Sequence, residues 1–257
     1  MPIIIKSQRE LAIMRAAGQI VAATLARLAE AVRPGVCTAE LDEMAHAEAT
    51  ARGAYPAFKG YRGFPASICA SINEEIVHGI PSPERVLRAG DIVSLDFGAV
   101  FEGFYGDAAI TVAVGEVSPE ARRLLAVTER ALFEGLALAR PSGFLSDISH
   151  AVQRCAESAG FSVVRQYVGH GIGRAMHEEP QIPNFGPPGR GPRLRPGMTL
   201  AIEPMVNIGG PETALLADQW TVVTADGSLS AHFEHTVAIT ADGHEILTRA
   251  DERRLGG

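Results

Sequence analysis

Four carboxylate residues lie inside or at the ends of strongly apolar segments. Asp96 stands in VSLDFG, and Asp107 follows eleven residues later, after GFYG. Glu203 ends the run LAIE, and Glu234 begins EHTVAI. A single buried acid is more often a salt-bridge or turn residue, but four charged groups in apolar strands are costly unless they are paired or bound to metal. Few lysines lie near them, so a bound cation is the economical source of compensating charge.

A histidine framed by glycines adds a nitrogen ligand to this set. His170 stands in GHGIG, where the small neighbours allow close approach to its imidazole. A GxG pattern alone is weak evidence for phosphate binding, and no P-loop lysine follows. One imidazole with four carboxylates is a hard, oxygen-rich donor set, unlike the Cys/His set of structural zinc. It suits paired Mn²⁺, Fe²⁺ or Co²⁺, and it also accepts Zn²⁺, with the two ions about 3.5–4 Å apart.

Two further histidines are less certain from sequence. His177 comes seven residues after His170, and His78 precedes a turn in EEIVHGIP. An isolated histidine is usually a surface or satisfied core residue, so the pattern alone leaves His78 evenly balanced between surface and site.

The elements that must position these residues follow from caps and periodicity. Ser7 and Glu10 form a capping box for a helix that ends at Arg33-Pro34-Gly35. Ser118-Pro119 starts another helix, expected to stop at Arg140-Pro141, and Ser146 is expected to cap a last one ending at Gly160. Loops are expected at 54–67 and 183–197. The remaining expected elements are a helix from Thr38 to Gly53 and strands at 92–97, 110–114, 161–168, 199–206, 219–224 and 234–239.

An internal repeat indicates the architecture. The segment LRAGDIVSLD (87–96) aligns with LRPGMTLAIE (194–203) at an offset of 107 residues, and helical segment 33–53 aligns with 140–160 at the same offset. Two unrelated helices and strands with similar composition could look alike, but they would not share one offset. We therefore expect one domain, 1–257, with two related halves, about 1–115 and 116–250. Facing halves would bring Asp96 and Glu203 together, with helices covering a curved, mostly antiparallel sheet of an α+β protein.

The composition narrows the class of protein. The chain has 257 residues and a net charge of −7, without a basic run of the kind that binds nucleic acid. Three widely spaced cysteines make no disulfide framework and indicate a reducing compartment. The N-terminal apolar stretch is too short for a signal peptide, and we expect no membrane-spanning segment. The expected location is the cytoplasm.

Five segments together resemble the type I methionine aminopeptidases, and the resemblance covers nearly the whole chain. They are SINEEIVHGIP (71–81), DIVSLDFGAVFEGFYGDAA (91–109), YVGHGIGRAMHEEPQIPNF (167–185), GMTLAIEPM (197–205) and SAHFEHTVAI (230–239). The resemblance implies the pita-bread fold of two pseudo-symmetric halves. Only 26 residues separate His177 from Glu203, which leaves no room for the insert of type II enzymes. We therefore expect the compact bacterial form, without a zinc-binding or ribosome-docking extension.

The resemblance also implies a division of labour among the metal ligands. Asp96 would chelate one ion, His170 and Glu203 would bind the other, and Asp107 and Glu234 would bridge both. The ions could be Co²⁺, Mn²⁺, Fe²⁺, Zn²⁺ or Ni²⁺. A water between them would attack the carbonyl after an N-terminal methionine.

The catalytic roles that the resemblance implies involve Glu203 and both accessory histidines. Glu203 would shuttle the proton, His177 would stabilise the developing oxyanion, and His78 would contact the scissile amide nitrogen. The methionine pocket would comprise Tyr61, Phe64, Cys69, Met176 and Trp220, with Phe58 at its rim. For each of these alone, core packing is the simpler interpretation. Asn73 and Ser230 match a monovalent-cation (Na⁺ or K⁺) site of some relatives.

The substrates implied are nascent polypeptides that begin with methionine followed by a small residue, met at the ribosome by a monomeric enzyme. A prolidase or aminopeptidase P is the nearest alternative, although those enzymes carry an additional N-terminal domain. Proteins of this fold that bind partners or RNA have lost their metal ligands, whereas all five ligand positions are filled here.

Overall fold

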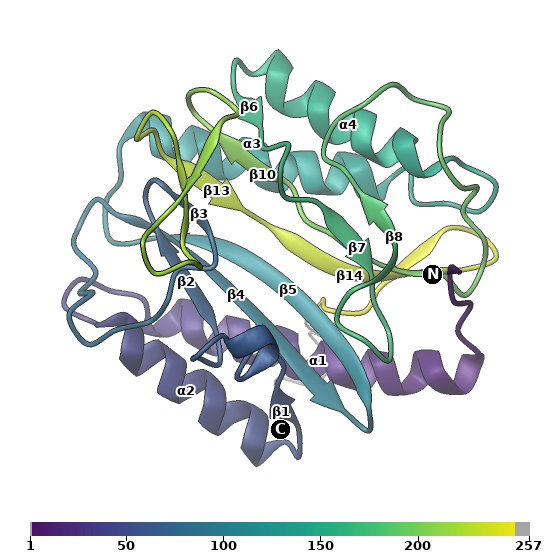
Figure 1. Ribbon diagram of the computed structural model, residues 1–257, viewed down its shortest axis with the longest axis horizontal. Coiled ribbons are helices and arrows are strands. Elements are labelled where there is room, and N and C mark those ends of the chain that lie inside the picture. Colours follow the sequence, from purple (N-terminus) through teal and green to yellow (C-terminus); the bar gives the residue numbers. More distant parts are fainter. Residues whose placement is uncertain (1, 250–257) are drawn as a thin grey trace.

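The computed structural model describes residues 2–249, and its centre is one strongly curved antiparallel sheet (Figure 1). The strand order is β1-β4-β5-β14-β9-β7-β8, with β2 also paired to β4 and β15 to β14. The strands of this sheet are β1 (Tyr55–Pro56), β2 (Cys69–Ile72), β4 (Ile92–Phe101), β5 (Phe104–Ala113), β7 (Gly169–Gly171), β8 (Glu178–Ile182), β9 (Thr199–Ile202), β14 (Glu234–Ile239) and β15 (His244–Ile246).

Two small antiparallel sheets accompany the central one. The first has the order β13-β10-β6 and the second β11-β12-β3. Their strands are β3 (Glu75–Val77), β6 (Ser162–Val163), β10 (Met205–Asn207), β11 (Thr213–Leu215), β12 (Val222–Thr224) and β13 (Ser230–His232). The helices are α1 (Gln8–Ala31), α2 (Thr38–Ala51), α3 (Pro119–Leu136), α4 (Leu145–Ser158) and the short 3₁₀ helix η1 (Tyr61–Gly63).

The helices cover one face of the central sheet. Val21 and Leu25 of α1 share a buried cluster with Phe97 and Ala108, and α3 and α4 contribute to a second cluster that contains Ile202. Strand pairing places Phe97 opposite Ala108, Ala108 opposite His235 and His235 opposite Ile202. Because side chains alternate along a strand, the residues next to this row point to the other face.

The close packing of α1 on the sheet depends on glycine. A Cβ atom added to Gly106 of β5 would lie 3.0 Å from the backbone nitrogen of Gly18 in α1. The helix axis can therefore approach the strand whose next residue is Asp107. The expected capping box of α1 is present, since the Ser7 hydroxyl accepts from the Glu10 amide at 3.3 Å and Glu10 accepts from the Ser7 amide at 2.9 Å.

Helix α1 is long and apolar enough to cross a membrane by length and composition alone, a test that a core helix also passes. Its buried residues include Met14, Val21 and Leu28. It packs against β4 and β5, so its apolar face forms part of the core.

Hydrogen bonds recur at the spacing of the sequence repeat. Isolated bridges join Cys37 to Val86 and Phe144 to Arg193, each residue being 107 positions from its counterpart. The backbone amides of Gly35 and Ser142 donate to the carbonyls of Leu87 and Leu194 at the same offset, both at 2.9 Å. Helices α2 and α4 likewise begin and end at residues 107 positions apart.

Several expected boundaries were wrong. Ser146 does not cap α4: the helix begins at Leu145, and the Ser146 hydroxyl instead accepts from the Arg190 amide. Helix α3 ends at Leu136, before the expected Arg140, because its last turn tightens into bonds such as Ala139 N–H to Leu136. Of the expected strand 161–168, Ser162–Val163 alone forms a strand, paired to β10.

Candidate metal centre

The concave face of the sheet, opposite the helices, collects the expected metal ligands. Asp96 on β4 and Glu234 on β14 both pair with Ala109 of β5, on its two sides. Asp107 lies two residues before Ala109 and therefore points to the same face. Strand register alone thus gathers these three carboxylates, although they come from separate strands.

The pairing of β7, β9 and β14 places the remaining two expected ligands, His170 and Glu203, on the same face. His170 of β7 pairs with Ala201 of β9, which pairs with Thr236 of β14. Glu203 follows β9 directly, two residues after Ala201, and it shares the face of His170. The His170 Nε2 atom lies 3.6 Å from Glu203 Oε1. His235, which neighbours Glu234, points to the helix side, where its ring meets Phe133.

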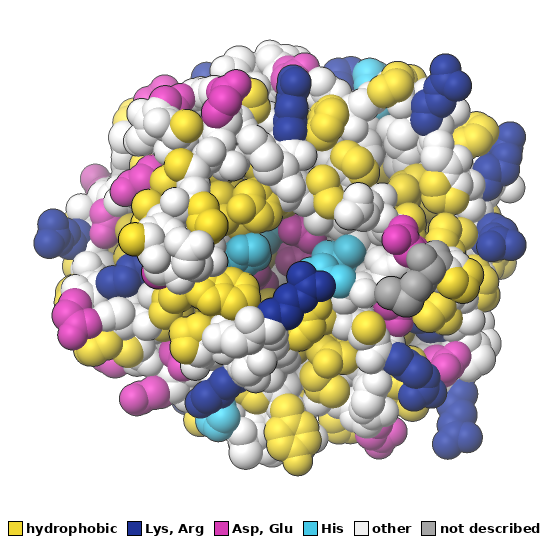
Figure 2. Space-filling view, viewed as in Figure 1, with side chains coloured by type: hydrophobic (Ala, Val, Ile, Leu, Met, Phe, Trp, Pro, Cys, Tyr) yellow, Lys and Arg dark blue, Asp and Glu magenta, His cyan; other side chains and the backbone are white. Residues whose placement is uncertain are grey.

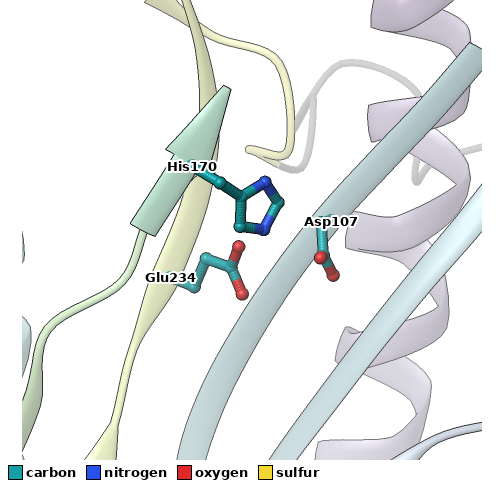
Figure 3. A group of neighbouring side chains, drawn as sticks. All are labelled: Asp107, His170 and Glu234. Atoms are coloured by element: carbon teal, nitrogen blue, oxygen red, sulfur yellow. The ribbon is translucent and has the colours of Figure 1, made fainter. Parts of the chain in front are cut away.

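A tight donor group lies at the centre of this face. Asp107, His170 and Glu234 each offer a ligand atom, and these atoms lie within 4.8 Å of one another (Figure 3). Figure 3 shows the three side chains pointing toward one another from β5, β7 and β14. All three side chains are buried. The group converges on a point that an ion of small radius could occupy.

The electrostatics of this group are unfavourable without a cation. Burial raises the pKa of Asp107 to about 7 and raises the pKa values of Asp96, Glu203 and Glu234 well above their ordinary range, with neighbouring carboxylates adding to the effect for the last three. Three buried oxygens have no hydrogen-bond partner in the described part of the chain: Asp96 Oδ1, Asp107 Oδ1 and Glu234 Oε1. Buried, unpaired acceptors clustered in this way fit a divalent cation.

The histidines near the acids are held neutral. Burial lowers the pKa of His170 to about 3 and that of His78 to about 4. A neutral imidazole can offer a lone pair to a metal, which suits His170. Its Nδ1 atom lies 2.9 Å from the Gly171 carbonyl oxygen. That contact makes Nδ1 the protonated nitrogen and leaves Nε2 free to face the acids.

His177 is oriented by a tyrosine. The Tyr61 hydroxyl lies 2.9 Å from His177 Nδ1, and the two rings stack with centroids 5.6 Å apart. When the hydroxyl donates, Nδ1 accepts and the proton of the neutral ring resides on Nε2. The His177 ring also lies 4.2 Å from that of His170, centroid to centroid, so His177 borders the metal centre.

His78 takes its place through an uncommon backbone conformation. Its φ is +62°, in the left-handed region that non-glycine residues rarely adopt. The following residue, Gly79, is held against β2, since Ala70 N–H donates to its carbonyl and its own N–H donates to the Ser71 hydroxyl. The ring is then packed at right angles to Tyr167 and Trp220. Strand β2 thus fixes the histidine at the wall of the site.

Acidic and apolar side chains together line one cavity on this face of the sheet. Its volume is about 160 Å³, and Figure 2 shows a hollow with acidic side chains at its floor, histidines on either side of them, a basic side chain at its edge and hydrophobic side chains around it. The five expected pocket residues and rim residue Phe58 all line it. The lining residues are Phe58, Tyr61, Arg62, Phe64, Cys69, His78, Asp96, Asp107, His170, Met176, His177, Glu203, Trp220 and Glu234.

The expected cation-binding pair, Asn73 and Ser230, is brought together outside this cavity. The Ser230 amide donates to the Asn73 carbonyl at 2.9 Å. The Asn73 side chain is engaged elsewhere, donating to Asp91 and accepting from the Ile92 amide. Any ion there would meet backbone and hydroxyl oxygens rather than the Asn73 amide group.

Sequence reasoning missed two participants. His232 is buried beneath Glu203 and Glu234, and its position two residues before Glu234 was a usable signal, since alternate residues of an extended segment share a face. The second is the buried ion pair of Lys6 with Glu178, whose carboxylate also accepts from the Arg174 amide at 2.8 Å. The ion pair anchors the segment that carries His177. Lys6 and Glu178 are far apart in the sequence, so no local pattern predicts that they pair.

Comparison with known proteins agrees with this geometry. The model of metallopeptidase family M24 matches residues 12–241, and the chain belongs to that family. Methionine aminopeptidase 1 of Bacillus subtilis is 57% identical over 247 residues, covering 96% of this chain and 99% of the relative. The methionine aminopeptidase of Clostridium acetobutylicum is 56% identical, covering 96% and 98%.

Solved structures give the fold independently. The crystal structure of methionine aminopeptidase from Thermotoga maritima matches with a TM-score of 0.96 at 47% identity, covering 96% of this chain and all of that one. Prolidase from Pyrococcus furiosus matches with a TM-score of 0.77 at 22% identity, covering 97% of this chain and 66% of that one, and this likeness shows the fold alone. The α+β pita-bread fold is thereby confirmed, as is the use of divalent metal.

Proposed function

We propose that this chain is a metal-dependent aminopeptidase that removes the initiator methionine from proteins whose second residue is small. The observation that carries the proposal is that potential metal ligands and apolar side chains line the same cavity. Carboxylates with buried oxygens that lack a partner among the described residues share one face of the sheet with His170. Together with apolar and aromatic side chains they line one cavity of about 160 Å³. The apolar part of this cavity suits an unbranched thioether side chain, and the acids lie where the bond beside it would be cut.

The register of the strands supports a shared role for these residues. Asp96 would hold one ion and His170 and Glu203 a second, while Asp107 and Glu234 would contact both. Support comes from Asp107, which lies on β5 between β4 and β14 and has a buried oxygen without a partner among residues 2–249. Such a dinuclear centre accepts Co²⁺, Mn²⁺, Fe²⁺, Zn²⁺ or Ni²⁺. When bound, the cations supply Lewis acidity and lower the pKa of a coordinated water.

The protein's own groups handle protons and orientation. Glu203 accepts a proton from the attacking water and passes it to the leaving amine. With the Tyr61 hydroxyl, 2.9 Å from Nδ1, acting as donor, His177 carries its proton on Nε2 and donates from there to the oxygen of the carbonyl under attack. His78 contacts the scissile amide nitrogen. Phe64, Cys69, Met176 and Trp220 hold the methionine side chain and exclude water.

The setting of the enzyme is the cytoplasm, where it meets nascent N-termini at the ribosome as a monomer, without nucleic acid or membrane as a direct partner. Residues 1–257 form a single catalytic domain of two related halves, about 1–115 and 116–250, and the recurring bonds at offset 107 support this division. Residues 1 and 250–257 lie outside the described part. Asn73 and Ser230 form a Na⁺ or K⁺ site.

The decisive experiment compares two peptides. The chain is stripped of metal, reloaded anaerobically with Fe²⁺, Mn²⁺, Co²⁺ or Zn²⁺, and given Met-Ala-Ser or an Ala-Pro peptide. We expect metal-dependent release of methionine and no cleavage before proline. Release of the proline-linked residue without methionine release would assign the chain to the prolidase type of this fold instead.

A further inference from the structure

His232 is a buried histidine to which the proposed reaction gives no role. It is the last residue of β13, and 2% of it is exposed. Neither ring nitrogen has a hydrogen-bond partner among the described residues. A buried polar group without a partner costs roughly 1–3 kcal/mol, so its retention in the core calls for an interaction that the bare protein does not complete.

The backbone of His232 is fixed from two sides. It pairs with Met205 of β10. Its amide donates to the Thr111 hydroxyl at 2.9 Å, and the same hydroxyl donates to its carbonyl at 2.8 Å. Thr111 belongs to β5, the strand that carries Asp107. The ring therefore emerges from a rigid position relative to the acidic face.

The ring is aimed at two of the proposed ligands. His232 Nε2 lies 3.8 Å from Glu203 Oε2 and 4.0 Å from Glu234 Oε2. The opposite oxygen of Glu203, Oε1, lies 3.6 Å from His170 Nε2. Glu203 thus stands between two imidazoles, one proposed as a ligand and the other behind it.

These distances are slightly too long for hydrogen bonds, which have N···O separations of about 2.7–3.2 Å. A shift of under about 1 Å would close the shorter one. Of the two carboxylate oxygens that face His232 Nε2, Oε2 of Glu203 is the nearer.

We propose that His232 is a positioning residue of the metal centre, donating from Nε2 to Oε2 of Glu203 so that Oε1 is held toward the ion. This proposal rests on the proposed function. A partner of this kind fixes the orientation of a ligating carboxylate, and its loss typically lowers metal affinity or activity about 10- to 100-fold. Because Glu203 is also the proposed proton shuttle, the same contact orients the group that moves the proton.

Three substitutions separate the hydrogen bond from packing. His232→Leu keeps an apolar volume and removes the donor. His232→Gln places an amide N–H near the position of Nε2, whereas His232→Asn carries the same amide on a shorter side chain, near the position of Nδ1. Affinity for Co²⁺ is measured by calorimetry on the full chain, together with the Co²⁺ absorption spectrum, kcat and KM for Met-Ala-Ser, and the thermal midpoint of the metal-free protein.

We expect His232→Leu and His232→Asn to weaken Co²⁺ binding about 10- to 100-fold and to lower kcat with little change in KM, and His232→Gln to stay within about threefold of the wild type. Unchanged affinity in His232→Leu would overturn the proposal. The proposal would also be overturned if the Co²⁺ absorption spectrum changed in the same way in the Leu and Gln variants, because His232 would then be a direct metal ligand. If the Leu variant does not fold, equal affinities of the Gln and Asn variants overturn it.

The wild-type chain keeps the two proposals apart. If it binds Co²⁺ but releases no methionine, the proposed function fails, while the affinities of the variants still test His232. If it releases methionine and the affinities of all three variants match the wild type, only the role of His232 fails.

Discussion

At the scale of single residues, Asp107 is buried, and one of its oxygens has no hydrogen-bond partner within the part of the chain that the structure describes. Burial raises its pKa to about 7, so the ionised side chain is stabilised poorly by the protein alone. Such a residue weakens the metal-free fold and gains its favourable interactions only when a cation is bound. Substitution at this position should therefore separate activity from stability.

We expect Asp107→Asn to reduce methionine release by more than the roughly 100-fold that loss of an outer partner can cost, because a bridging charge disappears. The metal-free variant should be as stable as the wild type or slightly more so, since the amide is neutral and nearly the same size. Peptide turnover, metal content and urea unfolding measure these effects. Near-normal turnover with full metal content would contradict the ligand assignment.

Tyr61 acts on His177 through one hydrogen bond. In Tyr61→Phe the ring and its stacking remain, but Nδ1 loses its donor and the Nε2–H tautomer is no longer favoured. A neutral hydrogen bond is worth about 0.5–1.5 kcal/mol, so we expect kcat to fall roughly 2- to 10-fold with metal content unchanged. Steady-state kinetics test this, with Tyr55→Phe as control because Tyr55 is exposed on β1. An equal effect in both variants would argue against the role of Tyr61.

The sequence indicated the five proposed ligands because four are carboxylates in apolar segments and His170 lies in a glycine-rich one. Tyr61 was expected in the pocket, and the cavity contains it, but its bond to His177 spans 116 positions and leaves no local pattern. His232 was overlooked because a lone histidine is ordinarily a satisfied core residue. Its lack of partners becomes visible only when the surrounding atoms are placed.

At the scale of elements, the ion pair of Lys6 and Glu178 joins the N-terminal segment to the chain around His177. Both side chains are almost fully buried, with 3% and 7% exposed. Glu178 also accepts from the amides of Arg174 and Ala175. It thereby determines the path of the loop immediately before His177.

We expect Lys6→Met to destabilise the protein by about 3–5 kcal/mol, because it leaves the Glu178 carboxylate buried without its cation. Activity should fall while metal content is retained, since His177 is not assigned as a ligand. The double variant Lys6→Met with Glu178→Gln should recover much of the stability. Urea unfolding and metal analysis give these quantities.

The matched control for Lys6 is Arg15→Met. Arg15 and Glu245 form an ion pair whose side chains are 44% and 37% exposed, and such surface pairs contribute about 0–1 kcal/mol. Equal losses in the two single variants would show that the buried pair has no special role.

Element boundaries were predictable where one local signal dominated. The capping box of Ser7 and Glu10 marked the start of α1 correctly. Ser146 is also a residue that commonly caps helices, but the predicted cap was wrong, because its hydroxyl accepts a hydrogen bond from the Arg190 amide across the loop. The repeat offset, which was not used to place this boundary, matches it: α2 begins at Thr38, and α4 begins 107 positions later at Leu145. A tertiary contact thus overrode a local preference for capping.

At the scale of the whole molecule, the two faces of the curved sheet have separate tasks. The helices bury large apolar clusters on one face, and the carboxylates gather on the other. The apolar clusters on the helix side include no proposed ligand. Metal should consequently add to the stability of a fold that already exists, unlike in small domains that are unfolded without metal.

Removing metal should abolish methionine release and leave the far-ultraviolet circular dichroism nearly unchanged. Readdition of an ion at about 100 times its dissociation constant should stabilise the fold by about 2.7 kcal/mol, which raises the thermal midpoint of a domain of this size by roughly 5–10 °C. Calorimetry with and without Mn²⁺ measures the shift, and Asp107→Asn should show a clearly smaller one because the site lacks a bridging charge. A metal-free chain without helical signal would show that the helix-covered core cannot fold alone, and an identical shift in Asp107→Asn would place the stabilising ion elsewhere.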